Sequence, residues 1–125
     1  RLLTTPTEKL SQTDISAKAL DIIKSTNKID HVSIVARRGI LNAAFTLKEL
    51  RELTKIDPDT VQCRIDLEQF KEINIEKLLD KLARPRKRLT EYMYQIAKTP
   101  LKPGIRKIIE LKFLRTPTEI LNTEK

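Results

Sequence analysis

A short apolar run that ends in two arginines and a glycine constrains the fold of this chain more than any other feature. The run 32–35 (VSIV) is rich in β-branched residues, and its length is typical of a buried strand. Arg37, Arg38 and Gly39 follow directly. In open α/β sheets, ligands bind beyond the carboxyl ends of the strands, so we expect these arginines near a ligand.

Two interpretations of the arginine pair remain open on the residues alone. Arginine can place two charge-assisted hydrogen bonds on one phosphate. Such bonds contribute about 1.5–3 kcal/mol each, or roughly ten- to a hundredfold in affinity, which is enough to prefer NADP with its 2′-phosphate to NAD. The other interpretation is a solvated strand end that binds nothing.

The residues after the arginine pair predict a capped helix. Thr46 and Glu49 have the spacing of a capping box, with Phe45 and Leu50 at the positions of a hydrophobic staple. We therefore expect a helix from Thr46 to about Thr54. A strand, an arginine-containing turn and a capped helix then follow one another, as in an α/β fold.

Hydrophobic spacing predicts the remaining elements. We expect residues 1–3 to end a helix that is broken at Thr4–Thr7, and residues 61–73 to form a loop with one helical turn. The other expected elements are a helix through Ile15, Ala19 and Ile22–Ile23, capped at Thr13-Asp14 and ending at Asn27-Lys28, a third helix over 75–82, a fourth over 89–96, and a second strand over 107–114. Pro85 either interrupts the third helix or starts the fourth.

Composition limits the classes of function. A chain of 125 residues supports one domain, and a net charge of +8 indicates an acidic partner, whether a protein, a nucleic acid or an anionic membrane surface. The single cysteine, Cys63, allows no internal disulfide, and it has no partner that would make it reactive. Gly39 and Gly104 are the only glycines, so a G-x-G nucleotide-binding turn is absent. The single histidine, His31, has no metal-ligand partners at a telling spacing.

A basic stretch gives the chain its second candidate site. Four of the five residues 84–88 are basic, which indicates either a solvated face or a surface for an acidic partner. Arg84 and Arg88 share one face of a helix, and Lys81 and Lys77 would extend that stripe if the helix continued. The absence of tryptophan and the 17 scattered acidic residues disfavour nucleic acid.

Several segments together resemble a known family. They are LLTTPTEKLSQTDIS within 1–30, HVSIVARRGILNAAFTLKELREL at 31–53, ARPRKRL at 83–89 and, more weakly, LKFLRTPTEIL at 111–121. They resemble the NADP-binding domain of the adrenodoxin reductase family, the mitochondrial ferredoxin–NADP reductases. The resemblance implies an α/β fold: part of a Rossmann-like NADP-binding domain in a flavoprotein with two dinucleotide-binding domains.

The resemblance also implies a function on the matrix side of mitochondria. Such an enzyme passes electrons from NADPH through FAD to an acidic [2Fe-2S] ferredoxin. By resemblance, Arg37, Arg38 and Glu49 contact NADP. Arg51, Arg84 and Arg88 dock the ferredoxin. These residues are all present, although Ala36 and Ile40 stand where the family has glycine and often proline.

Three points stay as expectations. The resemblance implies that residues 1–125 are one incomplete NADP-binding domain, inactive alone, whose glycine-rich turn and FAD domain lie elsewhere in the parent protein. Glu49 has two compatible roles, since it closes the capping box and can also orient an arginine or a ribose hydroxyl. The alternative from another class is a small, basic, non-enzymatic module that binds an anionic partner, either an acidic protein or nucleic acid.

Overall fold

A parallel sheet forms the centre of the molecule. The computed structural model describes residues 1–25, 29–71 and 73–122. The sheet contains β1 (His31–Ala36), β2 (Val61–Ile65) and β3 (Lys107–Phe113), in the spatial order β1-β3-β2. Both ladders are parallel, so the carboxyl ends of the three strands lie at one edge. The α/β class expected from the sequence is confirmed.

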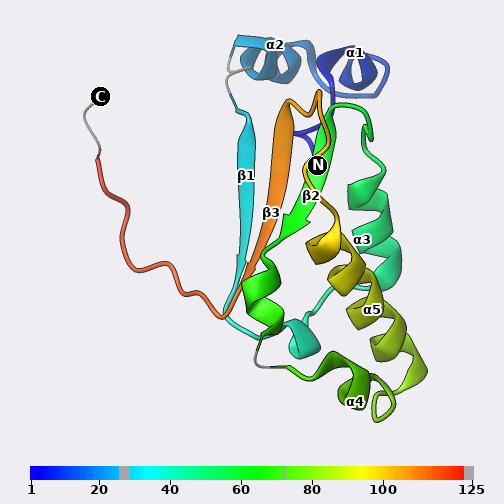
Figure 1. Cartoon of the computed structure of the whole chain (residues 1–125). Coiled ribbons are helices and arrows are strands. Elements are labelled where there is room, and N and C mark those ends of the chain that lie inside the picture. Colours follow the sequence, from blue (N-terminus) through cyan, green and yellow to red (C-terminus); the bar gives the residue numbers. More distant parts are fainter. Residues whose placement is uncertain (26–28, 72, 123–125) are drawn as a thin grey trace.

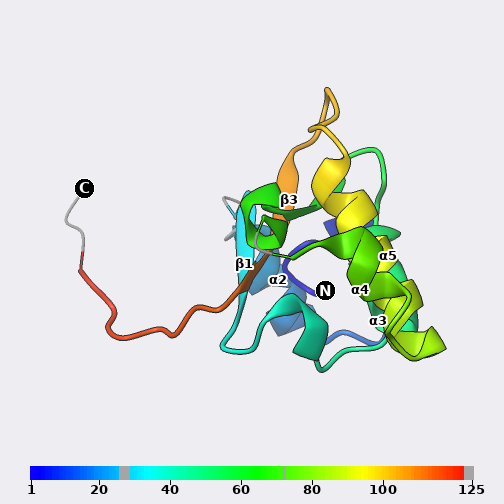
Figure 2. The same ribbon diagram turned by 60° about the horizontal axis from the view of Figure 1, so that its bottom comes forward.

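The helices divide between one face of the sheet and one of its ends. α3 (Leu47–Thr54), α4 (Ile75–Leu79) and α5 (Arg84–Lys98) lie together on the side of β2, away from β1 (Figures 1 and 2). α1 (Thr7–Leu10) and α2 (Ala17–Ser25) lie where the strands begin. Two short 3₁₀ turns, η1 (Ile40–Asn42) and η2 (Leu67–Phe70), follow β1 and β2. Within the described part of the chain, no helix has the length and apolar character needed to cross a membrane.

The core lies between β3, β2 and α5. Alternate residues of β3, namely Ile109, Leu111 and Phe113, are at most 3% exposed. The parallel register places Cys63 beside Ile109. The side chain of Met93 on α5 is fully buried. β3 is the central strand because both of its edges are paired. Its buried side chains alternate because one face of the strand packs into the core.

β1 is a strand, as predicted, but it is not buried. Ile34 and Val35 are each 42% exposed, and only Val32 and Ala36 in this strand reach intermediate burial. β1 is an edge strand that pairs only with β3 within the described residues, and α3, α4 and α5 lie away from it (Figure 1). β-branched residues favour the extended backbone, but the covering elements decide burial.

The loop predicted over 61–73 is wrong for its first part, which forms β2, whereas the helical turn expected within it is present as η2. Gln62 made this segment look polar, yet its side chain is only 9% exposed. Its amide nitrogen donates to the carbonyl oxygen of Pro100 (2.9 Å), and its amide oxygen accepts from the N–H of Lys102 (2.9 Å). A buried polar side chain is tolerated when its hydrogen bonds are made, so Gln62 fits a strand.

The N-terminal segment also differs from the prediction. Residues 1–3 form a turn rather than the end of a helix, and α1 begins directly after Pro6. The cap of the next helix is Ser16, whose hydroxyl accepts from the N–H of Ala19 (3.3 Å). Thr13, the expected cap, instead donates its hydroxyl to the carbonyl of Leu10 (2.7 Å) and so completes the preceding turn. The expected helix end at Asn27-Lys28 lies outside the described residues.

The surroundings of His31 and Cys63 indicate a structural role for each residue. His31 Nε2 lies 2.9 Å from Oε2 of Glu110 on the neighbouring strand. Although partial burial opposes it, hydrogen bonds from Lys112 and His31 hold the pKa of Glu110 below its usual value. Burial raises the pKa of the Cys63 thiol to about 11, so this thiol stays protonated at neutral pH.

The asymmetry between β3 and β1 leads to a stability prediction. We expect Ile109→Ala to lower the free energy of unfolding by about 2–5 kcal/mol, because it leaves a cavity in a packed core. Ile34→Ala, the matched change on the exposed strand, is expected to cost about 0.5 kcal/mol. Urea unfolding of the chain measures both, and equal losses would show that β1 is covered as deeply as β3.

Candidate functional site

The turn after β1 presents two arginines at the carboxyl edge of the sheet. Arg37 and Arg38 are exposed, and neither side chain has an ion-pair partner among the described residues. Hydrogen bonds from the segment after β3 hold the backbone of this turn. The carbonyl of Arg38 accepts from the N–H of Leu114 (3.4 Å), and that of Ala36 accepts from the N–H of Arg115 (3.2 Å). Leu114 adopts a φ of 54°, which costs an L-residue roughly 1–2 kcal/mol. The turn is fixed while its guanidinium groups stay free.

The predicted capping box at the start of α3 is confirmed. The backbone N–H of Thr46 donates to Oε2 of Glu49 (2.6 Å), and the N–H of Glu49 donates to the hydroxyl of Thr46 (3.3 Å). Phe45, just before the cap, packs against Phe113 with ring centroids 6.3 Å apart. These contacts place the first turn of α3 at the edge where β3 ends.

Glu49 is a carboxylate at neutral pH. The hydrogen bond from the Thr46 backbone, aided by the Thr46 hydroxyl, lowers the pKa of Glu49 below its usual 4.5, and desolvation opposes this only weakly. Within the described part of the chain, the hydrogen bonds to this side chain end on Oε2. Oε1 can therefore accept from a ligand hydroxyl or an arginine without breaking the cap. A phosphate at the same place would be repelled.

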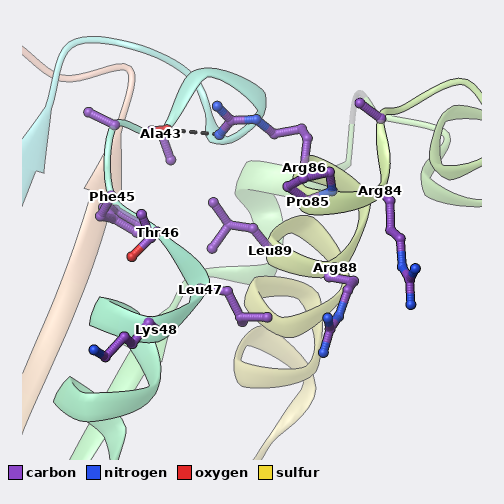
Figure 3. A pocket seen from close by; sticks show the side chains of 12 residues that line it. Ala43, Phe45, Thr46, Leu47, Lys48, Arg84, Pro85, Arg86, Arg88 and Leu89 are labelled. Atoms are coloured by element: carbon purple, nitrogen blue, oxygen red, sulfur yellow. Dashed lines mark hydrogen bonds between the residues drawn. The ribbon is translucent and has the colours of Figure 1, made fainter.

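The three arginines predicted to dock a partner share one face. Arg84 and Arg88 are exposed one turn apart on α5 and extend in the same direction (Figure 3). Tyr92 follows one turn later, and the guanidinium carbon of Arg51 on α3 lies 5.5 Å from the centre of its ring. Arg51 thus continues the line of the two α5 side chains. We call Arg51, Arg84 and Arg88 the arginine row.

The basic residues of the first turns of α5 have different tasks. Arg86 points the other way, and its guanidinium donates to the carbonyl of Ala43 (2.8 Å) (Figure 3). Lys87 lies 3.2 Å from a carboxylate oxygen of Asp80. Two of the four cations are therefore used within the fold. No sequence pattern predicts the Arg86 contact, because its partner is a backbone carbonyl 43 residues away.

The condition for extending the basic stripe through Lys77 and Lys81, a continuous helix, is not met, and Pro85 starts the next helix instead. α4 ends at Leu79, and α5 begins at Arg84 with Pro85 in its first turn. Proline is favoured there because the first N–H groups of a helix have no intrahelical partner. The two segments are separate helices, so the i, i+4 spacing does not carry across the break.

A groove separates the walls formed by the loop after η1 and by the first turns of α5. Its volume is about 830 Å³. The residues lining it are Ala43, Ala44, Phe45, Thr46, Leu47, Lys48, Ala83, Arg84, Pro85, Arg86, Arg88 and Leu89 (Figure 3). This lining includes four basic residues and no acidic one. Sequence reasoning missed the groove, because its two walls meet only in the folded chain.

Comparison with known proteins identifies the relatives of this chain. No protein-family model matches it. It is 41% identical over 121 residues to the mitochondrial NADPH:adrenodoxin oxidoreductase of Drosophila melanogaster, covering 96% of this chain and 25% of that protein. The human protein of the same name is 34% identical over 130 residues, covering 97% and 25%. NADPH-ferredoxin reductase FprA of Mycobacterium leprae is 37% identical over 120 residues, covering 96% and 25%.

Comparison with solved structures identifies the same kind of relative. Mycobacterium tuberculosis FprA in complex with NADPH superposes with a TM-score of 0.83 at 34% identity, over all of this chain and 26% of FprA. The chain is homologous to one segment of the adrenodoxin reductase family. It spans about a quarter of the length of these relatives. The resemblance seen in the sequence is thus confirmed along nearly the whole chain.

The capping carboxylate gives this chain a pH-dependent contribution to stability. Because hydrogen bonds lower the folded-state pKa of Glu49, its contribution is present above the usual value of 4.5 and is lost as the pH falls through the lowered one. We expect Glu49→Gln to lower the urea midpoint near pH 7 and to lower it less at acidic pH, as the pH falls below 4.5.

The control for this experiment is Glu119→Gln in the exposed segment after β3. We expect it to leave the midpoint unchanged at both pH values. A deficit of Glu49→Gln that is as large at low pH as at neutral pH would contradict the role of the charged cap.

Proposed function

We propose that this chain is part of the NADP-binding domain of an oxidoreductase that passes electrons from NADPH through FAD to an acidic [2Fe-2S] ferredoxin. The observation that carries the proposal is 34–41% identity, over 96–98% of the chain, to six proteins named NADPH:adrenodoxin oxidoreductase. These relatives are named mitochondrial, which supports the same location. The matrix side is a further part of the proposal.

In this proposal residues 1–125 are one incomplete domain. By the same proposal, the glycine-rich turn for the pyrophosphate and the FAD domain lie in the parent protein outside residues 1–125. When bound, FAD accepts a hydride and releases single electrons. The residues of this chain hold the nucleotide and the protein partner, and we assign no hydride-transfer role to any of them.

Arg37 and Arg38 are proposed to bind the 2′-phosphate of NADP. They lie beyond the carboxyl end of β1, where nucleotides bind in such sheets, and their guanidinium groups are exposed and unpaired within the described residues. Glu49, at the same edge on α3, is proposed to accept from a ribose hydroxyl or to orient an arginine. Its charge excludes it as a phosphate ligand.

The arginine row is proposed to dock the ferredoxin. Its members come from two helices, share one exposed face, and pair with no carboxylate among the described residues. Unpaired surface cations accelerate encounter with a negative partner and make it sensitive to salt. The basic, non-enzymatic module stays as the alternative prediction.

The nucleotide proposal predicts a change in cofactor preference. In the full-length enzyme, we expect Arg37→Ala with Arg38→Ala to lower kcat/KM for NADPH by about ten- to a hundredfold and to leave the value for NADH nearly unchanged. Steady-state reduction of a small dye with each cofactor measures the ratio. Arg64→Ala, which removes an exposed arginine on β2, is the control. An unchanged ratio would overturn the assignment.

The docking proposal predicts a separation of two activities. We expect Arg84→Glu with Arg88→Glu to raise the KM for adrenodoxin by at least about tenfold and to spare the reduction of a small dye by NADPH. Charge reversal should weaken the encounter without touching the nucleotide.

The control is Lys18→Glu with Lys24→Glu, which makes the same charge change on exposed positions of α2, at the opposite end of the sheet. If this control raises the KM for adrenodoxin equally, the effect comes from net charge and the arginine row has no special role.

A further inference from the structure

The groove beside the arginine row combines an apolar floor with a positive rim. Phe45, Leu47 and Leu89 contribute apolar side chains that also belong to, or pack against, the hydrophobic core. Lys48 and Arg88 are exposed on either side of it (Figure 3). A surface that attracts a partner by charge alone needs no such floor.

A specific contact fixes the spacing of the two walls of the groove. The hydrogen bond from the Arg86 guanidinium to the carbonyl of Ala43 (2.8 Å) joins the loop wall of the groove to its α5 wall. At the floor, Phe45 is fixed against Phe113. A preformed site binds more tightly, because little conformational entropy is lost when its partner enters.

The lining determines which chemistry fits. Its four basic side chains, Lys48, Arg84, Arg86 and Arg88, face no acidic residue in the lining. Arg86 is satisfied by a carbonyl, which leaves three cations for a partner. Tight interfaces typically bury an apolar anchor in a pocket and surround it with polar groups. The volume of about 830 Å³ is enough for an apolar side chain together with its flanking residues.

We propose that this groove receives a short acidic segment of the electron acceptor, with one apolar side chain on the floor and carboxylates on the rim. The inference rests on the proposed function and adds to it. The arginine row steers and orients the partner, while the apolar anchor slows its release. The two contributions respond differently to salt, because screening weakens charge pairs and leaves apolar burial intact.

Filling the groove without changing its charges tests the proposal. Ala44 and Ala83 are exposed small residues, one on each wall. In the full-length enzyme, we expect Ala44→Trp and Ala83→Trp each to raise the KM for adrenodoxin by about tenfold and to leave dye reduction and the KM for NADPH unchanged. The matched control is Ala17→Trp, at an exposed position at the start of α2.

Salt provides a second measurement. We expect Ala83→Trp to keep its defect in binding adrenodoxin at high ionic strength, where the effect of Arg84→Glu with Arg88→Glu shrinks. Ala83 lies on the α5 wall, opposite the side of the turn that carries Arg37 and Arg38. If Ala44→Trp raises the KM for NADPH and Ala83→Trp does not, Ala44→Trp disturbs NADPH binding through that turn.

The outcomes separate this inference from the function beneath it. If the tryptophan variants leave the KM for adrenodoxin unchanged while the arginine reversals raise it, docking is purely electrostatic and the groove proposal is overturned. If the arginine reversals also have no effect, the docking proposal itself fails. If both tryptophan variants raise the KM for NADPH instead, the groove belongs to the nucleotide site and this inference is wrong.

Discussion

The central position of β3 is the constraint on which the rest of the structure depends. It pairs in parallel with β1 on one edge and with β2 on the other, and every second side chain packs into the core. Parallel pairing brings the carboxyl ends of all three strands to one edge. The turn after β1, the start of α3 and the start of α5 therefore lie at the same end of the molecule (Figure 1).

That arrangement gives one short segment both proposed sites. The exposed arginines after β1 and the carboxylate at the start of α3 form the proposed nucleotide site, while the arginine row on α3 and α5 is the proposed docking face. The hydrogen bond from Arg86 to the carbonyl of Ala43 joins the loop beside the first set to the helix that carries the second. The proposed sites are neighbours held by one small core.

The basic stretch shows how a fold divides residues of one type among different tasks. Arg86 fixes a loop and Lys87 pairs with Asp80, whereas Arg84 and Arg88 remain unpaired within the described chain. Proline in the first turn of α5 sets where that helix begins. It also separates α5 from α4. Charge count alone therefore overstates the surface that is available to a partner.

The sequence by itself determined features that depend on local interactions: the strand propensity of 32–35, the capping box of Thr46 and Glu49, and the periodicity of α5. It also carried the family resemblance that the comparisons confirm. Tertiary structure decided what depends on distant partners. It exposed β1, made a strand of the segment around Gln62 by supplying hydrogen bonds from residues 100–102, and built the groove from two walls about 40 residues apart. Burial and shape arise from contacts between distant segments, and local patterns do not encode which segments will meet.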